Sequence, residues 1–249
     1  MTFVDTDDGR CDALTVRIES SGEGRLDPRD VPEDAERSER LELDEDAGEP
    51  GVSERDLAFR HEARRHLEST ARPEELPRAM VDERIAELRR REAVGEGHAV
   101  VEHLDVTDAQ LAQRALDGTD ARMDPKHPER HHITKPPPVN ATRFESPAAL
   151  VRAEAAAWES DTGRERRDAA LAGLPEQASS KELHDIQVKC VIPIEEALGP
   201  DWRDHVTGRS HASGGREETR FTADSVVVTR WRLDGEGTWY CQTCFPSAQ

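Results

Sequence analysis

The stretch DSVVVTRWRLDGEGTWYCQTCF, residues 224–245, decides the fold. It contains two runs rich in β-branched and aromatic residues, DSVVVTRWRL (224–233) and TWYCQTCF (238–245), joined by the turn sequence DGEG. Two such runs on either side of a short glycine-containing turn predict an antiparallel hairpin. The earlier run IQVKCVIPI (186–194) alternates in the same way and predicts a further strand.

The sequence before these strands has helical patterns. Ser53 can cap a helix over 54–70, and a second helix follows within residues 74–94, where apolar side chains recur on one side. Ser146 and Pro147 provide an N-cap and a first-turn proline for another helix. Helices followed by strands predict an α+β fold, with N-terminal helices packed against a twisted antiparallel sheet formed mainly by the C-terminal third.

Charge divides the chain into three parts. The 249 residues carry a net charge of −19, and residues 1–50 hold 17 Asp and Glu against 6 Arg. A block so acidic and so poor in apolar residues predicts a largely disordered leader over 1–50, with one strand-like piece at 12–20. Residues 51–93 are then expected to form a helical spacer, and residues 94–249 the main domain.

The sequence contains neither a recognisable signal peptide nor an apolar run long enough to span a membrane. We therefore expect a protein that is made in the cytoplasm and has no membrane segment. If it acts in another cell, a specialised secretion system must deliver it.

Cys241 and Cys244 form a CxxC pair, but the sequence offers no second pair to complete a four-ligand zinc site. Residues three apart on a regular strand also face opposite sides, so this pair is not expected to share a metal ion. We expect no metal and no cofactor.

Candidate chemistry lies in GHAVVEHLDVTDAQLAQRAL, residues 97–116. Thr107 and Gln110 fit a capping box at the start of a helix, and the short connection before it can fold Arg114 back near His103. Histidine exchanges protons near neutral pH, and a guanidinium group can hold phosphate oxygens. Together they supply what metal-free phosphodiester cleavage requires, with His98 as a candidate second proton carrier or a hydrogen-bonding residue at the turn.

The order of these motifs resembles a known family. GHAVVEHL, then TDAQL followed by RAL, then ATRFESPAALVRAEAAAW (141–158), and finally TWYCQTCFP (238–246) are similar to the RNase A-like C-terminal toxin domains of bacterial contact-dependent inhibition and polymorphic toxin systems. The resemblance covers about residues 94–249 and implies a metal-independent ribonuclease toxin. Its substrate would be RNA, for instance tRNA, and its partner a cognate immunity protein.

The resemblance also implies site residues. His103 would be the catalytic histidine, Arg114 the phosphate-stabilising cation and Thr243 a polar partner from the last strand. Attack of an RNA 2′-OH on the adjacent phosphate would give a 2′,3′-cyclic phosphate. Strand alternation predicts that Thr243 and Phe245 share a face with Cys241, opposite Gln242 and Cys244.

Substrate contacts are expected from Phe245, Arg230 and Arg232. Members of the family often carry tyrosine at the position of Phe245.

Two alternatives remain at this point. His131, His132 and Asn140 resemble the beginning of an HNH-type metal nuclease motif. Residues 98–249 hold 18 Lys and Arg against 25 Asp and Glu, which favours a non-catalytic acidic interaction module, such as a nucleic-acid mimic or a toxin-neutralising partner. A basic cleft built from Arg114, Arg143, Arg230 or Arg232 would favour the ribonuclease.

Overall fold

The structure is a computed structural model that describes residues 51–69, 72–124, 126–175 and 178–248. The predicted leader, with its strand-like piece, lies outside these residues. The described residues belong to one compact unit. Within the described ranges, no helix has the length and apolar character needed to cross a membrane.

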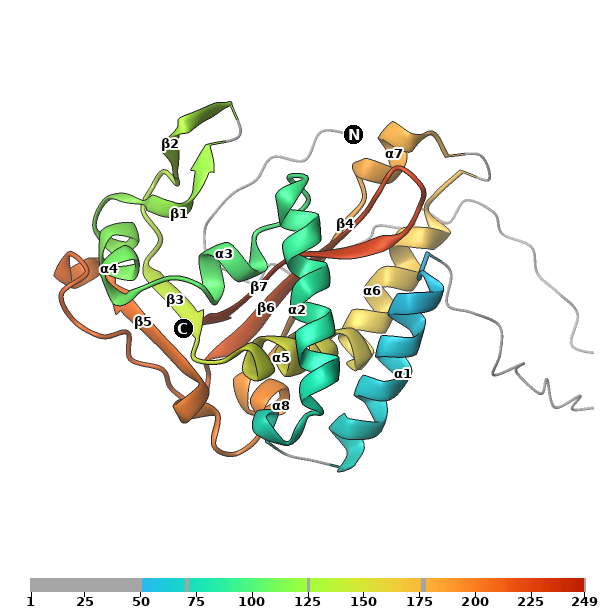
Figure 1. Ribbon diagram of the computed structural model, residues 1–249, viewed down its shortest axis with the longest axis horizontal. Coiled ribbons are helices and arrows are strands. Elements are labelled where there is room, and N and C mark those ends of the chain that lie inside the picture. Colours follow the sequence, from blue (N-terminus) through green and yellow to red (C-terminus); the bar gives the residue numbers. More distant parts are fainter. Residues whose placement is uncertain (1–50, 70–71, 125, 176–177, 249) are drawn as a thin grey trace, which may run out of the picture. The chain divides into compact units, whose positions relative to one another are not determined.

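The chain folds as the predicted α+β protein, with most helices before most strands (Figure 1). The helices are α1 (Glu54–Ser69), α2 (Arg78–Ala93), α3 (Ala99–His103), α4 (Asp108–Asp117), α5 (Pro147–Glu159), α6 (Asp161–Ala172), α7 (Ser180–His184) and α8 (Ile194–Leu198). The strands are β1 (Thr119–Asp124), β2 (His127–Ile133), β3 (Asn140–Phe144), β4 (Gln187–Pro193), β5 (Val206–Ser210), β6 (Val226–Leu233) and β7 (Trp239–Ser247).

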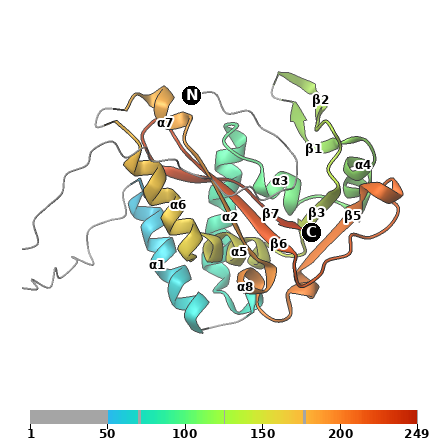
Figure 2. The ribbon, with the colours of Figure 1, turned by 180° about the vertical axis from the view of Figure 1, so that it is seen from behind.

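All strand pairs are antiparallel. The largest sheet has the order β4-β6-β7, and β6 and β7 form the predicted hairpin. Strand β3 pairs with β5, and β1 with β2. The β1–β2 pair forms an arm that extends from the rest of the fold beside α4 (Figures 1 and 2).

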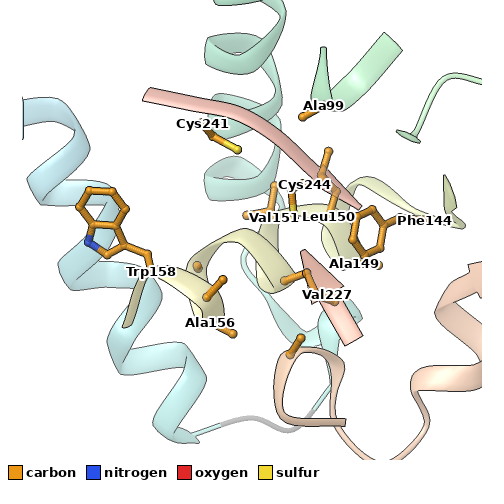
Figure 3. Close-up of a cluster of buried hydrophobic side chains, with 14 of the residues drawn as sticks. Ala99, Phe144, Ala149, Leu150, Val151, Ala156, Trp158, Val227, Cys241 and Cys244 are labelled. Carbon is orange, nitrogen blue, oxygen red and sulfur yellow. The ribbon is translucent and has the colours of Figure 1, made fainter. Parts of the chain in front are cut away.

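A bulge in β7 decides which way its side chains face. Arg230 of β6 pairs with Thr243 and Trp231 pairs with Cys241, so Gln242 is an extra residue without a partner on β6. Cys241 and Cys244 consequently both lie in the hydrophobic core (Figure 3). The predicted grouping of Cys241 with Thr243 and Phe245 was wrong, because alternation assumed a regular strand.

Helix α5 forms the centre of the core. Its Ser146 cap accepts the backbone N–H of Ala149, and ten consecutive residues from Ala149 to Trp158 are buried. The alanines allow close packing against the sheet (Figure 3), while Trp158 meets Trp231 of β6 edge to face at 5.3 Å. Together with α6 and α8, α5 covers one face of the β4-β6-β7 sheet.

A buried ion-pair cluster ties the N-terminal helices to this core. Glu154 of α5 is fully buried and accepts hydrogen bonds from Arg60 of α1 at 2.5 Å and Arg84 of α2 at 3.0 Å. Trp231 donates its indole N–H to the same carboxylate at 3.2 Å. Burial alone raises the pKa of a carboxyl, but the two arginines outweigh it and lower the pKa of Glu154 to about 2.

The predicted spacer over 51–93 therefore packs on the same core as the main domain. Helices α1 and α2 both contact α5, and the core includes Ala63, Met80 and Leu88. No boundary between compact units falls at residue 93.

Residues 127–133 form β2, a strand that the sequence analysis did not predict in this proline- and histidine-rich part of the chain. Its partner β1 pairs with it through an irregular register. Strands β3 and β5 were also not predicted. They are short, and β5 lies far from β3 in sequence, so neither carries a local hairpin signal.

Replacing Glu154 by glutamine should strongly destabilise the fold, because it removes the buried carboxylate that Arg60 and Arg84 share and leaves Arg84 with Asp56 as its counter-charge. We expect the free energy of unfolding to fall by about 3–5 kcal/mol, measured by urea denaturation. The matched control is Glu165→Gln on the exposed side of α6. A loss for Glu154→Gln no larger than that of the control would contradict this role.

Candidate active site

The segment that begins with Gly97 and His98 packs directly against the bulge in β7. The backbone N–H of His98 donates to the carbonyl of Gln242 at 2.9 Å. Gly97 has a φ of +121°, and a Cβ there would lie 3.0 Å from the same carbonyl oxygen. Glycine before His98 is therefore required by the close approach of the chain to β7.

His103 lies at the end of α3 and is 4% exposed. Its Nδ1 donates to the carbonyl of Thr142 at 3.2 Å, and its ring stacks on Phe245 with centroids 4.9 Å apart. Because a carbonyl can only accept, Nδ1 carries the hydrogen and Nε2 has the free lone pair. The His98 ring lies 6.3 Å from the His103 ring.

Glu102 occupies the centre of a buried charge cluster. One of its carboxylate oxygens lies 2.9 Å from Arg114, and the other lies 2.5 Å from Arg122. Asp120 of β1 completes the cluster by contacting Nε of Arg114 at 2.7 Å. The Nε2 atoms of His103 and His98 lie 3.9 and 4.0 Å from Glu102.

Burial keeps both histidines neutral. It is the main cause that lowers the pKa of His98 to about 3, and Arg122 and Arg114 lower it further. Burial and Arg114 likewise hold the pKa of His103 well below its ordinary value. Glu102 shows the opposite shift: burial raises its pKa to about 7, although Arg114 and Arg122 oppose this.

The β4-β6-β7 sheet contributes a basic face beside the histidines. Lys189, Arg230 and Thr243 are cross-strand neighbours, on the face opposite α5. Strands β4, β6 and β7 contain no Asp or Glu, although the chain has a net charge of −19. Among the described residues, neither Lys189 nor Arg230 has a side-chain hydrogen bond or ion-pair partner.

Thr243 has an unusual environment on this face. It is 3% exposed, and its hydroxyl has no hydrogen-bond partner among the described residues. A buried hydroxyl without a partner is costly, so a hydrogen bond from a group that reached it would be favourable. Arg230 lies close enough to His98 to lower its pKa. Thr243, Arg230 and the two histidines therefore border one region.

Other predicted site residues lie elsewhere. Arg232 donates to the carbonyl of His184 at 2.6 Å and so ties α7 to the sheet. Arg143 donates to the carbonyl of Val106 at 2.7 Å and pairs with Asp108 at 3.0 Å. The structure therefore brings together His98, His103, Arg114, Thr243, Phe245 and Arg230, but not Arg232 or Arg143.

The HNH-type group does not assemble. His131 is exposed on β2, whereas His132 binds Asp120, and Asn140 accepts a hydrogen bond from Thr219. Within the described part of the chain, only His98, Glu102 and His103 place three possible ligand atoms within 4.8 Å of one another. A metal ion there would compete with two guanidinium groups already bound to Glu102, so the group is poorly suited to a cation.

The sequence analysis did not single out three central residues, Glu102, Asp120 and Arg122. Glu102 carried a signal, since it is an acidic residue within the apolar turn HAVVEHL. Asp120 and Arg122 are two residues apart, so on a strand they face the same side. That spacing became informative only once β1 was known.

The region thus combines neutral histidines, an unpaired cation and a free hydroxyl. Comparison of the chain with known protein families, curated proteins and solved structures finds no match.

The pKa of His98 predicts how stability depends on pH. An unfolded histidine titrates near 6.5, so the unfolded state gains a proton between pH 6.5 and 3 that folded His98 does not take up, and stability falls as the pH drops. When the pH falls from 6.5 to 5, the free energy of unfolding of wild type should drop by about 2 kcal/mol more than that of His98→Asn, measured by urea denaturation.

The raised pKa of Glu102 has the opposite effect, because stability is lost as the pH rises from 4.5 to 7. Wild type and His98→Asn share this effect, so it does not alter the difference between them. The exposed residue His131 provides the control variant, His131→Asn, which should follow wild type. Equal losses for His98→Asn and wild type would show that His98 is not held neutral.

Proposed function

We propose that the chain is a metal-independent endoribonuclease of the RNase A-like toxin type, which cleaves RNA, for instance tRNA, by attack of the 2′-OH on the adjacent phosphate. The observation that carries the proposal is the convergence of His98 and His103 from α3 with Thr243 and Phe245 from β7. These groups are more than 130 residues apart in sequence, and their motifs are the ones that carry the family resemblance.

His103 acts as the general base. Its Nε2 has a free lone pair, because Nδ1–H is held by the carbonyl of Thr142. Stacking on Phe245 fixes the orientation of the ring, a role that does not need the tyrosine hydroxyl. When Nε2 takes the 2′-OH proton, the Glu102 carboxylate at 3.9 Å stabilises the imidazolium.

Arg230 and Thr243 bind the phosphate in this proposal. The guanidinium of Arg230 is unpaired and the hydroxyl of Thr243 is unsatisfied, so both can interact with an anion without breaking existing contacts. Arg114, the cation implied by the resemblance, is already held by Glu102 and Asp120. Its contribution is to hold Glu102 in place beside the histidines and to oppose the rise that burial causes in the pKa of Glu102.

Lys189 extends the basic face next to Arg230. A single RNA strand that follows β4 and β6 would meet these two cations and no carboxylate from the three strands. The local charge thus answers the difficulty raised by the acidic chain as a whole.

A ribonuclease of this type would damage the cell that makes it. We therefore propose a cognate immunity protein that binds over the basic face, and a specialised secretion system that delivers the toxin to a target cell.

One observation favours the second candidate, a non-catalytic acidic interaction module. Arg114 and Arg122 are both paired with carboxylates, so much of the positive charge of the site is neutralised internally. The following experiments separate the two functions.

The full chain should cleave total tRNA in excess EDTA and leave 2′,3′-cyclic phosphate ends. His103→Asn keeps an N–H for the carbonyl of Thr142 but lacks Nε2, and should lower the rate by about 100-fold or more. His61→Asn, at an exposed position on α1, should cleave like wild type. Cleavage only with a divalent ion, or an active His103→Asn protein, would exclude this mechanism, and inactivity with and without metal would favour the acidic module.

Arg230→Gln should weaken RNA binding and reduce its salt dependence. Binding of a 2′-O-methyl RNA, which cannot be cleaved by this route, is followed by fluorescence anisotropy over a range of salt concentrations. Loss of one phosphate contact should reduce the slope of log K against log salt by about 0.7. Arg164→Gln on α6, the same charge change on the covered side of the sheet, should leave the slope as in wild type, and equal slopes for all three proteins would contradict the assignment.

A further inference from the structure

Cleavage by the proposed route needs a second proton carrier. When the 2′-oxygen bonds to phosphorus, the bond from phosphorus to the 5′-oxygen breaks, and this strongly basic oxygen must receive a proton. His103 is occupied as the base. Burial and the neighbouring arginines lower the pKa of His98 to about 3, so near neutral pH it carries only the weakly acidic N–H of a neutral imidazole and is a poor general acid.

His132 on β2 borders the same charge cluster. Its Nδ1 lies 2.5 Å from the Asp120 carboxylate, which also accepts a hydrogen bond from Thr134 at 2.9 Å. The NH2 group of Arg122 lies 3.2 Å from Nδ1 and 3.4 Å from Nε2 of the ring. The side chain is 30% exposed, so a substrate can reach it.

Contacts connect His132 to the base. Asp120 binds Arg114 at 2.7 Å, and Arg114 binds Glu102 at 2.9 Å. Glu102 in turn lies 3.9 Å from Nε2 of His103. His132 and His103 therefore both border one cluster of fixed charges, His132 through Asp120 and His103 through Glu102.

We infer that His132 is the general acid of the proposed ribonuclease, with Asp120 as its positioning residue; this inference rests on the proposed function. The Asp120 carboxylate holds the Nδ1–H, which leaves Nε2 to donate to the 5′-oxygen. His103 takes up the proton of the 2′-OH, His132 gives one up, and the products are the 2′,3′-cyclic phosphate and a free 5′-OH. Charge and protons balance without a metal ion.

A pair of substrates tests this role. Diribonucleotides need a proton on the departing 5′-oxygen, whereas nucleoside 3′-(4-nitrophenyl phosphates) release nitrophenolate, which departs without one. Both give the same cyclic product. His132→Asn keeps an amide N–H for Asp120 but has no Nε2, and His131→Asn on the same strand is the matched control.

His132→Asn should lower kcat/KM for the diribonucleotides by about 100-fold or more and change kcat/KM for the nitrophenyl esters by less than about threefold. Equal losses on both substrates would show a structural role, and no loss on either would show that His132 takes no part; each result overturns the inference. Wild type that cleaves neither substrate would instead refute the proposed ribonuclease, and the inference with it. Activity of His132→Asn on the nitrophenyl esters also shows that the variant is folded.

Discussion

The extra residue at Gln242 in β7 is the constraint on which the candidate site depends. Without it, regular alternation would place Cys241 on the face of Thr243 and Phe245 and turn Cys244 away. With it, both cysteines enter the core, and Thr243 and Phe245 face the histidines. The carbonyl of the same residue accepts the backbone N–H of His98, so the bulge both turns the strand and receives α3. Bulges often have this effect next to functional sites.

The charge cluster around Glu102 has two opposing effects. Burying two carboxylates with two guanidinium groups is costly in desolvation, and burial, together with the positive charges, lowers the pKa values of His98 and His103. A neutral imidazole is the form that a general base requires. The same pairing withdraws Arg114 and Arg122 from direct contact with an anion, whereas Arg230 lies outside the cluster.

Local sequence signals predicted the fold class well and the site only in part. The β6–β7 hairpin and the caps at Ser53, Thr107 and Ser146 depend on neighbouring residues, and all are present in the structure. The bulge, by contrast, depends on how β7 pairs with β6, and alternation along one strand does not reveal it. The cluster partners Asp120, Arg122 and His132 lie on an arm whose proline content favoured a loop, so their shared face could not be foreseen.

The buried carboxylate of Glu154 has a consequence for modularity. It sits at the centre of the core, yet Arg60 and Arg84, which neutralise it, come from helices that precede the first histidine motif. A fragment that starts at residue 94 would keep the histidines and the basic sheet but would carry an uncompensated negative charge in its interior. A fusion that moves this domain to another protein must therefore include α1 and α2, so its junction must lie before Ser53. The domain boundary expected from the sequence, at residue 94, lies some forty residues further along the chain.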